Sequence, residues 1–184
     1  MTYDTRLSHA VAIRVLVLCT RNSARSQVAE ALFATIGADR VIAASAGSDP
    51  GAGVHPLAVE ALAEVGIDWQ GRTAQGIPAV ENAPWDAVIT VCDAARDACP
   101  YMPTAGLTAH WGLADPAAVA GDHAAQLQAF RSVRNTLRDA ITAFVNVIDQ
   151  AHASNAPLSL RDALDVGQLI IDRSPVTSTT DTTL

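Results

Sequence analysis

Cys19 and Arg25 are the residues of this chain whose types and spacing point most directly to chemistry. They lie between an apolar run of strand length and a helix-like pattern, with Ser26 where a helix N-cap belongs. Such a loop binds phosphate-like anions through its backbone N–H groups, and an arginine adds a planar, bidentate fork. The same positive field stabilises a thiolate, so Cys19 is predicted to be a nucleophile beside an oxyanion site. The alternative is an inert buried cysteine at a strand end, which leaves the spacing to Arg25 unexplained.

The elements that must position this loop alternate between strand and helix patterns. Apolar, β-branched runs predict strands at 13–18, 40–46 and 87–92, with a short fourth strand at 107–111. Helical spacing follows the first two strands, and a long amphipathic helix is expected at 119–152. This alternation predicts an α/β fold, a single domain with a four-stranded parallel sheet flanked by helices.

Length and composition favour one well-packed domain with a modest appendage, because 49% of the 184 residues are hydrophobic and 17% are charged. We place an N-terminal extension at 1–12, the domain at 13–152 and a C-terminal extension at 153–184. The Thr- and Ser-rich end, 176–184, is expected to be disordered.

A short helix is expected within the C-terminal extension. Ser159 and Asp162 have the spacing of a capping box. The residues that follow carry Leu160, Leu164 and Leu169, which would form the apolar face of that helix.

Charge and cysteine content exclude several classes of function. The formal charge of −7 argues against a nucleic-acid groove or an anionic membrane surface. No apolar run is long enough to span a bilayer. Three cysteines without an even pairing or an export signal indicate a reducing compartment, the cytoplasm. No transition metal is expected, because His55, His110 and His123 show no ligand spacing with the cysteines.

Two further chemical groups are expected at the same edge of the sheet as Cys19. Ligands of open α/β sheets bind beyond the carboxyl ends of the strands, which is where Cys92 and Asp115 fall. Cys99 follows Cys92 at a spacing that, taken alone, is equally typical of two unrelated cysteines.

The run from Cys19 to Gln27 resembles the anion loop that low-molecular-weight protein tyrosine phosphatases share with thioredoxin-coupled arsenate reductases. The segment 92–100, followed by His110-Trp111-Gly112 and Asp115-Pro116, is similar to the redox segment of those reductases. The resemblance covers about 13–148 and implies the strand order 2-1-3-4. Phosphatases of the family carry an aromatic residue directly after the loop Asp-Pro, whereas Ala117 and Ala118 follow here. A small inorganic oxyanion, arsenate, is therefore the expected substrate.

The resemblance also implies a reaction. The Cys19 thiolate attacks arsenic, Asp115 protonates the departing hydroxide, and Cys92 then attacks the Cys19 sulfur to release arsenite. Cys99 resolves the Cys19–Cys92 disulfide into Cys92–Cys99, which thioredoxin reduces, so no tightly bound cofactor is needed. The oxyanion is held by the loop residues Thr20, Arg21, Asn22, Ser23, Ala24, Arg25 and Ser26.

Supporting roles are also implied by the resemblance. Asn22 and Ser26 shape the loop or hydrogen-bond the thiolate, and Asn22 tolerates the left-handed conformations that such loops need. Some family members bind a monovalent cation, potassium, behind the loop. Its ligands would be Asn22, Glu30, Ser45 and Asp68. Arg21 departs from the family pattern, in which glycine is usual.

Three other functions compete with a thioredoxin-coupled arsenate reductase. One is a low-molecular-weight phosphatase whose extra cysteines only protect Cys19, and another is an arsenate reductase that uses a small thiol as reductant. The third is a non-catalytic sensor in which the cysteines bind arsenite or a metal. A sensor leaves Arg25 unexplained, because soft cations prefer thiolates to a guanidinium.

Overall fold

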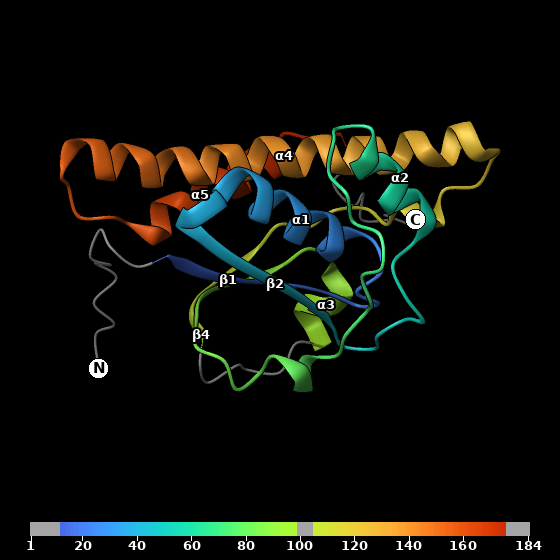
Figure 1. The fold of residues 1–184 in the computed structure, drawn as a ribbon, viewed down its shortest axis with the longest axis horizontal. Helices are drawn as coiled ribbons and strands as arrows, with labels where there is room; N and C mark the ends of the chain where they lie inside the picture. Colours follow the sequence, from blue (N-terminus) through green and yellow to red (C-terminus); the bar gives the residue numbers. More distant parts are fainter. Residues whose placement is uncertain (1–11, 99–104, 176–184) are drawn as a thin grey trace, which may run out of the picture.

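The computed structural model describes residues 12–98 and 105–175, and within them a single four-stranded sheet (Figure 1). All pairings are parallel and the strand order is β2-β1-β3-β4, which confirms the predicted fold class and order. The strands are β1 (Ile13–Cys19), β2 (Val41–Gly47), β3 (Trp85–Thr90) and β4 (Ala105–His110).

Helices cover both faces of the sheet, with α1, α4 and α5 on one side and α3 on the other (Figure 1). The α-helices are α1 (Arg25–Gly37), α2 (Pro56–Ala63), α3 (Asp93–Ala98), α4 (His123–Ser154) and α5 (Leu160–Asp172). Short 3₁₀ turns are η1 (Ala38–Arg40), η2 (Ile77–Ala79) and η3 (Pro116–Ala118). In the ranges that the structure describes, none of these helices is both long enough and apolar enough to cross a membrane.

The strand β1 is apolar because its two faces belong to two different cores. Val15 and Val17 join the larger core, which the long helices cover, whereas Leu16 and Leu18 join a smaller one with Trp85 on the opposite face. Alternate side chains of a strand point to opposite faces, so a strand buried on both sides must be apolar throughout. This burial fixes the register of β1 and thereby the position of Cys19, its last residue, at the carboxyl end of the strand.

Helix starts differ from the predictions in two places. The N-cap of α1 is Ala24 and makes no side-chain cap, so the N-cap prediction for Ser26 is wrong. The hydroxyl of Ser26 lies instead 2.9 Å from the sulfur of Cys19. The helix α4 begins at His123 rather than at 119, because the Asp122 carboxylate accepts a hydrogen bond from the backbone N–H of Ala125 at 2.9 Å.

The C-terminal extension forms the predicted helix, α5, whose first turn is capped by Ser159 through a 3.2 Å hydrogen bond from the backbone N–H of Asp162. Leu160 and Leu164 are buried as expected. Leu169 is 47% exposed, so its assignment to the apolar face is wrong. Helical periodicity places Leu169 on the opposite side from the residues that do complete the buried face, which are Ala163, Gly167 and Ile171. The end of the chain, 176–184, lies outside the described residues.

Candidate active site

The loop after β1 wraps around the sulfur of Cys19, and this residue is only 3% exposed. This sulfur accepts a hydrogen bond from the backbone N–H of Asn22 at 3.1 Å and lies 2.9 Å from the hydroxyl of Ser26. Asn22 has a φ of 49°, in agreement with the left-handed conformation predicted for it. These two contacts fix the position of the sulfur inside the loop, as a nucleophile beside an anion site requires.

A segment after β2, residues 48–55, straps the outside of this loop. Its backbone N–H groups donate to four loop carbonyl oxygens. The pairs are Ser48 to Cys19 at 3.2 Å, Asp49 to Thr20 at 2.9 Å, Gly51 to Arg21 at 2.8 Å and His55 to Ser23 at 2.7 Å. Four carbonyl dipoles are thereby turned toward the strap, which leaves the inside of the loop to N–H groups.

Gly47, at the end of β2, allows the strap and the loop to come this close. A Cβ at this position would lie 2.6 Å from the carbonyl oxygen of Thr20 and 2.9 Å from the backbone nitrogen of Asn22. No side chain larger than hydrogen fits without moving the loop backbone. Gly47 was not predicted as a site residue, although a glycine at the end of a strand that faces a functional loop is a usable signal.

A buried polar network holds Asn22 from behind. Its amide nitrogen donates to the hydroxyls of Ser26 at 2.9 Å and Ser45 at 2.7 Å. Its amide oxygen accepts from the side chain of Gln27 at 3.0 Å and from the backbone N–H of Gln75 at 2.9 Å. Fully satisfied buried networks are rigid, so this one fixes the loop conformation. Gln27 and Gln75 were not predicted as site residues.

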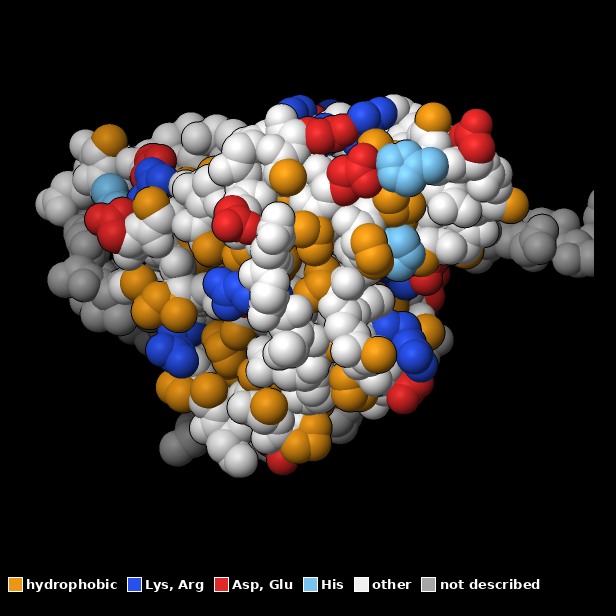
Figure 2. Space-filling model, turned by 45° about the vertical axis from the view of Figure 1, so that its right-hand side comes forward, with side chains coloured by type: hydrophobic (Ala, Val, Ile, Leu, Met, Phe, Trp, Pro, Cys, Tyr) orange, Lys and Arg blue, Asp and Glu red, His pale blue; other side chains and the backbone are white. Residues whose placement is uncertain are grey.

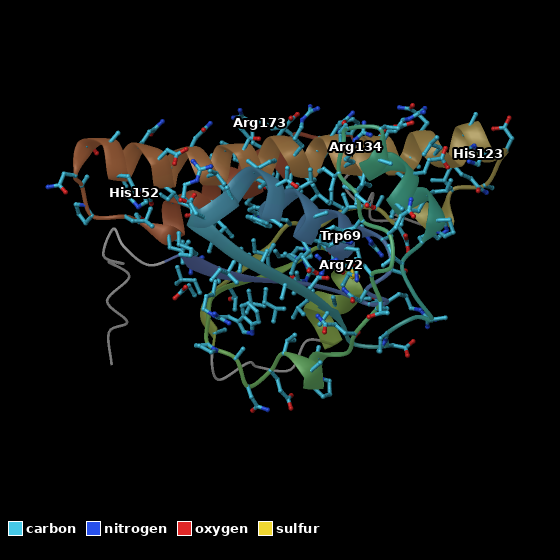
Figure 3. All side chains as sticks on the ribbon, in the orientation of Figure 1. Trp69, Arg72, His123, Arg134, His152 and Arg173 are labelled. Carbon is cyan, nitrogen blue, oxygen red and sulfur yellow. The ribbon has the colours of Figure 1, made fainter. Side chains whose placement is uncertain are left out.

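Glu30 and Arg72 continue this network toward the surface. The Ser45 hydroxyl donates to Glu30 at 2.6 Å, and the Arg72 guanidinium, stacked over the ring of Trp69, lies 4.0 Å from the other carboxylate oxygen (Figure 3). Burial raises the pKa of the Glu30 carboxyl, against the opposing effects of the Ser45 hydrogen bond and the Arg72 charge.

The residues predicted to bind potassium do not all come together. Asn22, Ser45 and Glu30 are hydrogen-bonded in sequence, whereas Asp68 is exposed and accepts from the backbone N–H of Gln70 at 3.0 Å. The set does not fit a free cation, because the amide oxygen of Asn22 already accepts two hydrogen bonds and the Arg72 guanidinium already faces Glu30. Elsewhere in 12–98 and 105–175, no cluster of three or more His, Cys, Asp or Glu side chains could hold a metal ion.

Arg25 and Asp115 form an ion pair beside the loop. One terminal guanidinium nitrogen of Arg25 lies 3.1 Å from the carboxylate of Asp115, and the other donates to the carbonyl oxygen of Leu113 at 2.9 Å. The Nε of Arg25 is buried and has no hydrogen-bond partner among the described residues. A buried donor without a partner costs about 1–3 kcal/mol, and an oxyanion bound in the loop would supply the missing acceptor.

Cys92 lies beside the loop, two residues after the end of β3. Its sulfur is 3.4 Å from the hydroxyl of Thr20, the residue that follows Cys19, and 3.4 Å from the backbone nitrogen of Ala95 in α3. Both Cys19 and Cys92 are free and buried. The strand order therefore brings a second thiol to the loop, whereas Cys99 lies outside the described residues.

The start of α3 is tied to β4 through His110. One ring nitrogen of His110 is 2.8 Å from the hydroxyl of Thr90, and the other is 2.9 Å from the carboxylate of Asp93. Arg96 lies 3.6 Å from the same carboxylate. These side chains hold α3 next to Cys92, and none of them was predicted as a site residue.

Arg21 leaves the loop intact despite its departure from the family pattern. Its side chain is 58% exposed and pairs with Asp49 of the strap at 2.6 Å. Arg21 therefore adds a charge at the outer side of the loop without replacing a buried contact.

The surface on the right-hand side of Figure 1, turned forward in Figure 2, carries scattered charges among hydrophobic and uncharged side chains.

The residues 14–154 match the family model of low molecular weight phosphotyrosine protein phosphatases. The chain belongs to this family.

Several of its relatives are named arsenate reductases. The arsenate reductase of Halalkalibacterium halodurans is 37% identical over 130 residues, which are 71% of this chain and 93% of the relative, and that of Bacillus subtilis is 36% identical over 132 residues, which are 71% and 93%. A solved arsenate reductase in its phosphate-binding state is 32% identical, covers 75% of this chain and 98% of its own, and superposes with a TM-score of 0.63.

Proposed function

We propose that this chain is an arsenate reductase that converts arsenate to arsenite. The observation that carries the proposal is the sulfur of Cys92 at 3.4 Å from the hydroxyl of Thr20, next to the nucleophile. A phosphatase needs one thiol in its anion loop, whereas reduction of arsenate needs a second thiol to take up the oxidising equivalents. The arsenate reductases of H. halodurans and B. subtilis, similar over most of this chain, support the same assignment.

The first chemical step forms a sulfur–arsenic bond. The Cys19 thiolate attacks arsenic(V), and one arsenate oxygen departs as hydroxide, which the carboxyl group of Asp115 protonates to water. Arg25 and the loop N–H groups hold the remaining oxygens, and the unpartnered Nε of Arg25 is the donor available for this. The short distance of 3.1 Å between Arg25 and Asp115 keeps the acid at the bound oxyanion.

The second step transfers two electrons to arsenic. The Cys92 thiolate attacks the sulfur of Cys19, the sulfur–arsenic bond breaks with its electron pair going to arsenic, and arsenite leaves as arsenic(III). Cys99 then attacks Cys92, which forms the Cys92–Cys99 disulfide and returns Cys19 as a thiolate.

We propose that α3 opens before the final disulfide forms. In an intact helix, residues seven apart have their α-carbons ~10.5 Å apart, beyond the ~7 Å that a disulfide tolerates. Opening exposes the bridge to a protein dithiol, for which we propose thioredoxin. The Synechocystis relative, 33% identical over 128 residues, is named a glutaredoxin arsenate reductase, so glutaredoxin is the alternative donor to test. With a dithiol donor we propose that the reaction takes place in a reducing compartment, the cytoplasm.

One experiment separates this function from its rivals. We expect arsenate-dependent NADPH oxidation with thioredoxin and thioredoxin reductase, and no comparable hydrolysis of an aryl phosphate. Replacing thioredoxin by glutaredoxin and glutathione identifies the donor. Cys92→Ser should abolish turnover with either donor. Aryl phosphate hydrolysis that survives Cys92→Ser, without any reduction of arsenate, would instead identify a phosphatase.

A further inference from the structure

The helix α5 is the largest part of the described chain that lies beyond the segment matched to the family, 14–154. It lies beneath α4 on the same side of the sheet as α1 (Figure 1). Its buried face contributes Leu160, Ala163 and Leu164 to the main core, and Leu158 in the preceding turn is also buried. The extension is therefore part of the domain core and not an independent appendage.

Trp111, the residue that follows β4, packs against α5, and its side chain is fully buried. The carbonyl oxygen of Leu164 accepts a hydrogen bond from the indole N–H at 3.2 Å. At Gly167 the ring lies against the helix backbone, and a Cβ there would be 2.1 Å from the ring carbon Cζ2. Phe33 and Phe144 bound other sides of the ring, with centroid separations of 6.1 and 6.4 Å. These contacts hold the indole of Trp111 in one position, and α5 supplies one side of its packing environment.

The backbone that follows Trp111 leads directly to the oxyanion site. The backbone N–H of Trp111 donates to Thr90 at 2.8 Å, and that of Leu113 donates to Val91 at 3.2 Å. The carbonyl oxygen of Leu113 then accepts from Arg25. Asp115, two residues on, pairs with the same guanidinium. The two partners that the Arg25 guanidinium has among the described residues are therefore carried by the few residues after Trp111.

We propose that α5 is a positioning element of the oxyanion site, in which Gly167 and Leu164 seat Trp111 and thereby place the Leu113 carbonyl and the Asp115 carboxylate against Arg25. The inference rests on the proposed function in that the site is taken to bind an arsenate-like oxyanion. Gly167 and Trp111 touch no reacting atom in this scheme and act only through Arg25 and Asp115.

The test measures the Kd for inorganic phosphate by calorimetry, using the full chain. Gly167→Ala places a methyl group against the indole although alanine is the better helix former, so any loss cannot come from helix propensity. A misplaced guanidinium should raise the Kd roughly tenfold to hundredfold. The matched control is Asp165→Ala, which changes an exposed residue of the same helix to the same amino acid and should leave the Kd unchanged.

Rescue distinguishes positioning from general destabilisation. Trp111→Phe replaces the indole by a smaller ring and removes the hydrogen bond to Leu164. As a single variant it should also weaken phosphate binding. The double variant W111F/G167A has room for the added methyl group and should bind phosphate more tightly than G167A. If Gly167→Ala does not fold, Trp111→Phe decides the question.

The proposal is overturned if folded Gly167→Ala or Trp111→Phe protein binds phosphate like the parent while hydrogen exchange reports a loosened α5. It is also overturned if the double variant shows no recovery. Phosphate binding does not require reduction, so a parent protein that binds phosphate without reducing arsenate refutes the proposed function and leaves this inference standing.

Discussion

The loop after β1 and the segment after β3 each place a cysteine at the carboxyl end of the sheet, but different contacts hold them. Asn22, Ser26 and Ser45, which support Cys19, are fully buried and hydrogen-bonded to one another. The helix α3, which supports Cys92, has six residues, and its ties involve side chains such as Asp93, 44% of which is exposed. Buried networks resist opening, whereas short, partly exposed elements open at low cost. The loop after β1, which forms the oxyanion cradle, is therefore the rigid side of the site. The segment around α3, which rearranges in the proposed reaction, is its lightly held side because its contacts are partly exposed.

The largest expected effect comes from replacing the charged group of the rigid side, which is the guanidinium of Arg25. Arg25→Lys keeps the positive charge but loses the planar fork, so kcat/KM for arsenate should fall roughly 10²–10³-fold. Thioredoxin-coupled NADPH oxidation measures the loss. Arg138→Lys, at an exposed pair with Asp139 on α4, is the matched control and should behave like the parent. Parent-like kinetics in Arg25→Lys would remove Arg25 from the site.

A second way to break the rigid side is to push the strap away from the loop. Gly47→Ala inserts a methyl group against the backbone of Thr20 and Asn22, which should lower the free energy of unfolding by about 1–3 kcal/mol. Phosphate affinity should fall at least ~10-fold, since a displaced loop misdirects its N–H groups. Urea denaturation and calorimetry measure the two effects. Gly53→Ala, where a Cβ meets nothing within 4 Å, is the stability control.

On the lightly held side, His110→Ala should loosen α3 without disturbing the cradle. Losing its contacts to Thr90 and Asp93, each worth about 0.5–1.5 kcal/mol, should increase hydrogen exchange in 93–98 several-fold. The phosphate Kd should stay within about twofold of the parent, because no contact of Arg25 is touched. The control is Thr108→Ala, an exposed position on the same strand. Equal losses of phosphate affinity in His110→Ala and Gly47→Ala would erase the contrast between the two sides.

A smaller effect is expected from the charge of Glu30. Because burial raises its pKa in the folded protein, unfolding releases a proton as the pH rises above the ordinary value of 4.5, and stability falls until the folded-state pKa is passed. Glu30→Gln should therefore be more stable relative to the parent at pH 7 than at pH 4. Urea midpoints at the two pH values check the sign. A relative stability that is the same at both would contradict the raised pKa.

The smallest expected effect concerns the cation. Because Arg72 already faces Glu30, exchanging potassium for sodium or choline at constant ionic strength should change neither the melting temperature nor kcat/KM of the parent. Arg72→Met keeps much of the apolar bulk and removes the charge, and any potassium-specific stabilisation should emerge only there. A melting temperature of the parent that rises specifically with potassium would restore the predicted cation site.

Local patterns were sufficient to predict the parallel sheet and the placement of Cys19, Cys92 and Asp115 at one edge of it, whereas the strand order was implied by the resemblance to the family. The apolar runs are contiguous, and parallel strands present their carboxyl ends at one edge. Local rules failed at Ser26, because its hydroxyl has a partner in Cys19 that a capping rule does not consider.

Long-range contacts explain what the sequence did not predict. Gln75 lies 53 positions from Asn22, whose amide oxygen accepts its backbone N–H. The glycine requirement at Gly47 exists only because the loop backbone passes within contact distance. Nothing in the types of these residues specifies their partners, because tertiary packing brings them together.

The packing of Trp111 against α5 also has a consequence for folding on the ribosome. The carbonyl group that binds its indole belongs to a residue 53 positions later, near the end of the described chain. Domains fold from the N-terminus as they are synthesised, so the sheet can assemble while this large aromatic side chain still lacks its cover. Until α5 emerges, the nascent protein exposes an apolar surface next to an incomplete oxyanion site. Chaperone binding would be most needed in that interval, and the oxyanion site would be complete only after α5 has been synthesised.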